Sequence, residues 1–269
     1  MVCDKVRIRF RKDSPLHLIG HHDLMRCLER MMRRASIPFA MSEGFHPLPR
    51  LMIAQSLSLG IVGCHEAADI EMTSAIEPDA VLDLLRAQAP AGLDILSIRR
   101  IPLRTTATPC GMVYTVRLPD PLPADLTDLV AGINGRAELW VERVRPQPRE
   151  VNIRPFVRAA SILEACDSTR YRRLRFDFRV LPQGTARVDE LLRLCGLERL
   201  LTDGSRVERS ELHLLDERPE GFVPEAVELP EPMHRPLPST AVVSSPVPGL
   251  RPEPATTSWG ASPNGPVTE

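Results

Sequence analysis

KVRIRF (residues 5–10) and YRRLRFDFRVL (residues 171–181) are the two stretches that decide the fold of this 269-residue chain. In the first, Val6, Ile8 and Phe10 alternate with basic residues, and the second repeats the alternation over a longer run. Strict alternation of apolar and charged side chains predicts a β-strand with one buried face and one charged face. We therefore expect each half of the chain to place such a strand in a sheet.

The patterns around these two strands follow the same order in both halves. The first half predicts a helix over 21–35, strands over 38–41, 51–59 and 67–73, a helix over 77–89 and a strand over 93–103. The second half predicts strands over 112–118, 139–145, 150–157, 171–181 and 207–215, with helices over 124–133 and 188–195. Both halves thus follow a βαβββαβ order, which predicts an α+β fold of tandem ferredoxin-like modules over 1–104 and 110–216.

Residues 217–269 differ in composition from the rest of the chain. They hold 12 of the 27 prolines and show no apolar periodicity, which predicts a disordered, proline-rich, acidic C-terminal tail. The tail has seven acidic residues and three arginines, so 31 basic and 28 acidic residues remain in 1–216, a net charge of +3. We interpret the tail as a spacer, with a partner-binding segment or an electrostatic mimic as the alternatives.

Several classes of protein are disfavoured by the sequence. No run of 18 apolar residues occurs and the first 15 residues lack the apolar centre of a signal peptide, so we expect a cytoplasmic protein with no membrane span. The six cysteines are scattered without a C-x-x-C motif, which argues against a disulfide framework and against a local iron–sulfur motif.

Histidines near the start of the first predicted helix are the candidate catalytic residues. His21 and Asp23 begin that helix, and His46 lies in the loop SEGFHPLPR (residues 42–50). In a ferredoxin-like module these positions can meet at one edge, as an acid/base pair, an anion pocket or a metal site. The spacing matches no ligand signature, so no metal is predicted. The structural alternative is that Asp23 caps the helix and His46 bonds within its own loop.

The loop around His46 is a candidate binding surface. Gly44 permits a positive φ, and Pro47 and Pro49 hold the following backbone extended. A rigid loop that presents Phe45 and His46 suits binding better than an arbitrary connection does. The alternative is a tight turn with Phe45 buried in the core.

Arginines aligned on predicted faces are the third candidate. The sheet faces carry Arg7 and Arg9 on one strand and Arg173, Arg175 and Arg179 on the other. Rows of arginine can bind RNA phosphates or stack on bases, and pairing with Asp69 and Glu71 is the structural alternative. The first helix adds further candidate binding residues on its polar side, namely Arg30, Arg33 and Arg34.

Nine short motifs resemble a family of bacterial proteins of uncharacterised activity linked to radical-SAM enzymes. They are H-x-D (21–23), ERMMRRA (29–35), IPFA (37–40), GFHPLP (44–49), LSLG (57–60), HEAADIE (65–71), VNIRPFV (151–157), RVDELLRLCG (187–196) and VERSELHL (207–214). The resemblance covers about residues 5–215. Family members occur alone or fused C-terminal to cobalamin-binding-type radical-SAM proteins.

The chain departs from the family pattern in the same loop. The family loop reads G-F-N-P-H-P, whereas His46 stands here for the asparagine and Leu48 for the second histidine. The serine that precedes H-x-D in the family is Gly20 here. If the family's loop histidine has a function, that function is either moved to His46 or lost in this chain.

The resemblance implies a non-catalytic accessory or substrate-presenting protein for a radical-SAM enzyme, in RNA or ribosome-related modification. On that hypothesis the chain binds no cofactor, and S-adenosylmethionine and the iron–sulfur cluster belong to the partner. The alternative is a stand-alone RNA-binding or RNA-processing protein in which His21 or His46 acts as a metal-independent general base. A metal-dependent enzyme is the third hypothesis.

Overall fold

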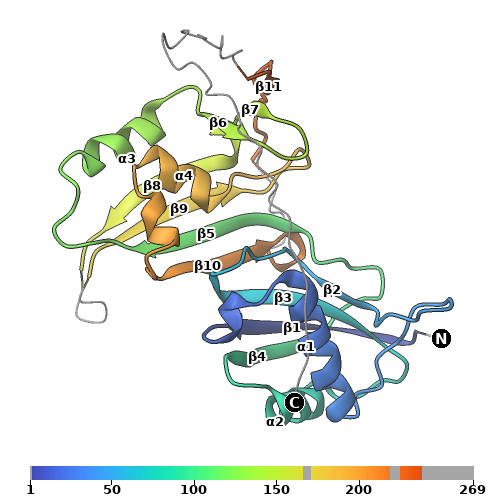
Figure 1. Cartoon of the computed structure of the whole chain (residues 1–269). Helices are drawn as coiled ribbons and strands as arrows, with labels where there is room; N and C mark the ends of the chain where they lie inside the picture. The colour runs from blue at the N-terminus through green and yellow to red at the C-terminus, as the bar shows by residue number, and fades with distance from the viewer. Residues whose placement is uncertain (1, 166–170, 219–224, 238–269) are drawn as a thin grey trace, which may run out of the picture. The chain divides into compact units, whose positions relative to one another are not determined.

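The computed structural model of the chain describes residues 2–165, 171–218 and 225–237. This part of the chain is an α+β structure with four α-helices, an eight-stranded sheet and a second sheet of three strands (Figure 1). The predicted α+β class is therefore confirmed. Much of the predicted tail, residues 219–224 and 238–269, lies outside the described residues.

The first half supplies four strands and two helices. Its elements are β1 (Asp4–Lys12), α1 (His21–Arg34), β2 (Leu51–Ile53), β3 (Val62–Met72), α2 (Pro78–Gln88) and β4 (Leu93–Arg100). The strands pair antiparallel in the order β4-β1-β3-β2. Alternate residues of β1 are buried against α1, since Val6, Ile8 and Phe10 share a core with Leu28 and Met32.

The second half supplies the rest of the large sheet. Its elements are β5 (Pro109–Arg117), α3 (Leu126–Gly135), β6 (Trp140–Arg143), β7 (Arg149–Asn152), β8 (Val157–Leu163), β9 (Arg173–Arg179), α4 (Val188–Leu194) and β10 (Val207–Leu214). Here the strands pair antiparallel in the order β10-β5-β9-β8. Leu174, Phe176 and Phe178 of β9 share a core with Leu191 and Leu192 of α4.

The two halves meet where β3 runs parallel to β10, pairing Gly63 with Arg209. Arg209 is buried at this seam and donates to Glu66, with its Nε 2.8 Å from Oε1. Lys12 is buried beside them and donates from Nζ to Ile19 O at 3.0 Å. Burial lowers the pKa of Lys12, and Arg209 lowers it further, although Glu66 opposes both effects.

The helices of both halves cover the same side of the sheet. Arg209 pairs with Tyr114, which lies in the core of the second half, and its guanidinium reaches Glu66, which pairs with Phe10. The covered faces of the two cores are therefore continuous through this ion pair. The opposite side, here called the open face, carries Arg7, Arg9 and the arginines of β9.

The structure differs from several predicted elements. Residues 38–41 form no strand and make isolated bridges at Phe39 and Met41, while the strand predicted over 51–59 ends at Ile53. The strand predicted over 150–157 ends at Asn152, a 3-10 turn follows at Arg154–Phe156, and β8 (Val157–Leu163) is a strand that the sequence analysis did not predict. The hairpin β6–β7 forms its own sheet with β11 (His234–Arg235).

Part of the region predicted as tail is placed against the second half. His234 pairs with Val151, Met233 packs against the large core, and Glu225 contacts Arg179. Short 3-10 turns complete the described chain, namely η1 (Leu16–Leu18), η2 (Arg154–Phe156), η3 (Glu198–Leu201) and η4 (Leu215–Glu217). In the part of the chain that the structure describes, no helix has the length and apolarity needed to span a membrane.

Candidate nucleic-acid interface

The open face of the sheet carries the arginines of both halves because alternation places every second side chain of a strand there. Arg7 and Arg9 of β1 lie opposite Asp69 and Ala67 of β3. Arg173, Arg175 and Arg179 of β9 lie opposite Arg117, Thr115 and Gly111 of β5. These two groups of arginines differ in how their charge is balanced.

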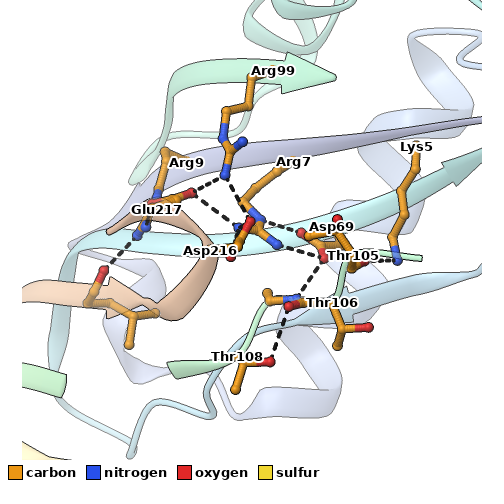
Figure 2. A network of polar contacts seen from close by, with 12 residues as sticks. Lys5, Arg7, Arg9, Asp69, Arg99, Thr105, Thr106, Thr108, Asp216 and Glu217 are labelled. Carbon is orange, nitrogen blue, oxygen red and sulfur yellow. Dashed lines mark hydrogen bonds and ion pairs between the residues drawn. The ribbon is translucent and has the colours of Figure 1, made fainter. Parts of the chain in front are cut away.

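Arg7 is fully buried among carboxylates (Figure 2). Its Nε donates to Asp69 Oδ1 at 2.6 Å, its Nη2 donates to Oδ2 at 3.1 Å, and its Nη1 donates to Asp216 at 2.7 and 2.8 Å. Asp69 Oδ2 also accepts from the backbone N–H of Ala107 at 3.0 Å. Burial acts to lower the pKa of Arg7, but the bonds to Asp69 and Asp216 outweigh it and raise the pKa. Arg7 therefore stabilises the fold and has no exposed surface for a ligand.

Glu217 neutralises the neighbouring arginines of the first half (Figure 2). It pairs with Arg9 and accepts from Arg99 Nη2 at 2.9 Å. Arg9 also donates from Nη1 to the backbone oxygens of His65 and Leu212, at 2.8 and 2.9 Å. Burial acts to raise the pKa of Glu217, but the bonds from Arg9 and Arg99 lower it overall. The chain thus balances this part of the open face with its own carboxylates.

Arginines of the second half form a cluster with little such balance, which we call the arginine patch: Arg117, Arg173 and Arg175. Arg117 and Arg173 are direct cross-strand partners, and Arg175 is two residues further on the same face. The nearest carboxylate oxygen to Arg175 is that of Asp177, 3.9 Å from Nη2. Among the described residues, the buried Nε of Arg173 has no hydrogen-bond partner. The patch therefore has excess positive charge.

An aromatic ring lies beside the patch. The guanidinium carbon of Arg117 is 4.4 Å from the ring centroid of Tyr171, which is half-buried. Both residues line a pocket of about 500 Å³ that also includes Arg172, Asp120 and Ser205. A stacked arginine and tyrosine offer flat surfaces on which a base can stack.

Arg206 extends the row of arginines across the sheet. Its carbonyl accepts from Arg117 N at 3.3 Å, immediately before Val207 pairs with Val116. Its own charge is balanced, because Nη2 donates to Asp13 at 2.8 Å and Nε pairs with Glu208. Bonds from Arg206 and Arg11 lower the pKa of Asp13 well below its usual range, although burial opposes this.

No hydrogen bond or ion pair joins the three candidate catalytic residues in the described part of the chain. His21 begins α1 with its ring centroid 5.7 Å from that of His22, and Asp23 pairs with Arg26 at 3.5 Å. His46 is exposed in its loop, and no hydrogen bond or ion pair links it to His21 or Asp23. The described residues contain no group of three or more His, Cys, Asp or Glu side chains that could hold a metal.

The loop around His46 presents Phe45 to solvent. Phe45 is fully exposed, at 102%, so the alternative of a buried Phe45 does not hold. The base of the loop is closed by Ser42 N to Leu48 O at 2.7 Å and by Leu48 N to Ser42 Oγ at 2.9 Å. Gly44 has a φ of +124°, the conformation that favours glycine.

The arginines of α1 lie on the helical side of the sheet and are exposed. Arg33 pairs with Glu29 at 2.8 Å, and Arg34 donates to Gln88 O at 2.8 Å. For Arg30 the described part of the chain offers no ion-pair partner. These side chains do not share a face with the arginine patch.

The sequence analysis did not select Arg117 of the patch or the neighbouring Tyr171. Arg117 is the last residue of β5, where Val113, Thr115 and Arg117 lie on one face. That alternation could have placed Arg117 on the open face from the sequence alone. The opposition of Arg117 and Arg173 depends on the register of two strands more than 50 residues apart, which alternation does not give.

Comparison with known proteins identifies the family. The family described as "Uncharacterized protein conserved in bacteria (DUF2344)" matches residues 5–187, which is more than half of the chain. The chain belongs to this family. The DUF2344 match includes the arginine patch. No curated protein matches the sequence.

Three solved structures are distantly similar to this DUF2344 protein. A Cbf5–Nop10–Gar1 complex has a chain that is 12% identical with a TM-score of 0.37, and an archaeal box H/ACA sRNP Nop10–Cbf5 complex has one that is 13% identical with a TM-score of 0.34. Each match covers 76% of this chain, which spans about half of theirs, 48% and 47%. An unknown protein from Galdieria sulphuraria is 12% identical with a TM-score of 0.24, covering 79% of this chain and 98% of that one. Scores this low carry no argument about function.

Proposed function

We propose that this DUF2344 protein is a non-catalytic RNA-binding protein whose arginine patch contacts RNA. The observation that carries the proposal is the direct opposition of Arg117 and Arg173, with Arg175 beside them and one carboxylate 3.9 Å away. A phosphate group between such side chains would offset their mutual repulsion and accept their free hydrogen bonds.

The energetics of Arg173 favour a ligand. A buried donor left without a partner costs about 1–3 kcal/mol, and like charges directly opposed in a sheet add to this. Arg173 Nε is such a donor among the described residues. A bound phosphate would offset the repulsion between Arg117 and Arg173, so ligand binding is coupled to the relief of an unfavourable arrangement.

Tyr171 favours RNA over an inorganic anion. Single-stranded RNA is recognised by stacking of its bases on aromatic rings and guanidinium planes, together with contacts to phosphate. Tyr171 and Arg117 supply that pair of surfaces beside a pocket of about 500 Å³. The patch therefore combines the two kinds of contact that single strands require.

The direct test is equilibrium binding to a fluorescently labelled single-stranded RNA. Changing Arg117, Arg173 and Arg175 together to glutamine is expected to abolish most of the binding. Unchanged affinity in that variant would overturn the proposal.

We further propose that the protein acts in the cytoplasm as an accessory to a radical-SAM enzyme. That enzyme would carry the S-adenosylmethionine and the iron–sulfur cluster. The support is the motif resemblance, together with scattered free thiols: all five described cysteines are unpaired. Affinity purification from the native cell should recover an iron–sulfur protein. Recovery of RNA without such a protein would leave RNA binding intact and reject the accessory role.

We interpret the two halves as tandem ferredoxin-like modules, with boundaries at 1–104 and 110–216. The support is the common order of strands, in which the fourth strand of each half lies beside the first, and the third beside the second. In the second half this interpretation treats β6 and β7 as an insertion between α3 and β8. The arginine patch would then belong to the second module alone.

A further inference from the structure

A second site lies on the open face at the other end of β9 from the arginine patch. Its pocket measures about 580 Å³, and its apolar lining comes from Pro109, Cys110, Val180, Leu181, Pro182 and Leu215. Arg179 is six positions after Arg173, which is about 20 Å along a strand. The pocket is within the 300–1,000 Å³ range of small-molecule sites.

Two arginines meet at this pocket and hold a carboxylate. Arg179 binds Glu225 in bidentate fashion, with Nε 2.9 Å from Oε2 and Nη2 2.9 Å from Oε1. Arg158 lies with its Nε 4.0 Å from Glu225 Oε2. A planar guanidinium fork facing both oxygens of one carboxyl group is the geometry that recognises a carboxylate.

The arginines are fixed from behind, whereas the carboxylate is not. Arg179 is 14% exposed and donates from Nη1 to Val157 O at 3.0 Å, and Arg158 donates to Asp177 at 3.0 Å. The Glu225 side chain is 56% exposed, and its described bonds are those to the guanidinium groups. Removing Glu225 from the pocket would therefore leave the two arginines oriented for another carboxylate.

We propose that this pocket binds a small molecule with an apolar body and one carboxylate, and that Glu225 occupies the carboxylate position when no ligand is bound. The apolar body lies against Pro109, Val180 and Leu215, and the carboxylate replaces that of Glu225 on Arg179. The site is separate from the arginine patch, so this proposal does not depend on whether the protein binds RNA.

The test uses the full chain and two probes that share an apolar body and differ in the head group, the carboxylate of 4-phenylbutyrate and the uncharged hydroxymethyl group of 4-phenylbutan-1-ol. Ligand-observed NMR titration is expected to give saturable binding of the acid and at least about tenfold weaker binding of the alcohol, since the alcohol cannot form the charge-assisted bidentate pair with Arg179. Glu225→Gln removes the internal competitor and should tighten acid binding severalfold. Arg179→Gln should weaken it about tenfold.

The Glu225→Gln variant keeps the test valid if Arg179→Gln fails to fold. Glu225 is exposed, and in the described chain its side chain bonds only to the guanidinium groups of the pocket. Equal binding of acid and alcohol would overturn the proposal. So would an acid affinity that falls or stays constant in Glu225→Gln. RNA binding measured on the same samples should not change, which separates this site from the arginine patch.

Discussion

Arg117 and Arg173 face each other across the β5–β9 pair on the open face, two positive charges in direct cross-strand register. Elsewhere on this face the chain supplies carboxylates, such as Asp69 for Arg7 and Glu217 for Arg9. At Arg117 and Arg173 it supplies none among the described residues. An arrangement that is unfavourable in the free protein is a reason to expect a ligand.

Arg173→Gln should change stability and RNA binding in opposite directions. Removing one of two opposed charges should raise the free energy of unfolding by about 0.5–1 kcal/mol, while RNA affinity falls. Urea denaturation and fluorescence anisotropy measure the two quantities on one preparation. A variant that is both less stable and weaker in binding would show that Arg173 has a structural role instead.

Asp69→Asn should strongly destabilise the protein, because it leaves the buried guanidinium of Arg7 with incomplete charge compensation. Breaking a buried pair costs about 3–5 kcal/mol. The matched control is Glu71→Gln, two residues along the same strand, whose pair with Arg50 is partly exposed and should be worth less than about 1 kcal/mol. Equal losses in urea denaturation would contradict this account of the network.

Asp13→Asn should change the dependence of stability on pH. Its bonds to Arg206 and Arg11 depress the pKa of Asp13 in the folded state. The stabilisation is therefore fully present above the unfolded pKa, about 3.9, and is lost as pH falls toward the folded pKa. The wild type should exceed Asp13→Asn by about 1 kcal/mol at pH 7 after solvent screening, and the difference should shrink below about pH 4. A difference that grows on acidification would have the wrong sign.

Phe45→Ala should leave stability unchanged to within about 0.5 kcal/mol, because its side chain is fully exposed. Phe176→Ala is the contrasting change, since Phe176 has no exposed surface and stacks near Phe178 at 6.1 Å between centroids. Loss of a buried phenylalanine costs about 3–5 kcal/mol. Thermal and urea denaturation of both variants measure the contrast, and a large loss for Phe45→Ala would place that ring in the core.

The local parts of this fold could be predicted because alternation and helical periodicity are local. The buried face of β1, the apolar stripe of α1 and the pairing of Arg7 with Asp69 as an alternative to ligand binding all follow from residues near one another in sequence or in adjacent strands. The seam could not be predicted. The parallel pairing of Gly63 with Arg209 joins positions 146 residues apart, and no local pattern encodes it.

The candidate site could be predicted from the sequence only in part. Arg173 and Arg175 could be placed on a charged face, but which arginines are neutralised depends on Asp216, Glu217 and Glu225, all of which follow β10. Glu217 and Glu225 were assigned to a tail on composition. Their contacts with strands of the open face come from tertiary packing, which overrides that assignment.

The measurement that tests the central claim most directly is the salt dependence of RNA affinity for two matched triple variants. One changes Arg117, Arg173 and Arg175 to glutamine, and the other changes Arg30, Arg33 and Arg34 of α1, so that both remove three positive charges. We predict that the patch variant loses about 100-fold in affinity and that the slope of log affinity against log salt becomes shallower by about 2, since each phosphate contact on a single strand contributes about 0.7. The helix variant should keep the wild-type slope. Equal losses in the two variants, or a larger loss in the helix variant, would contradict RNA binding at the arginine patch.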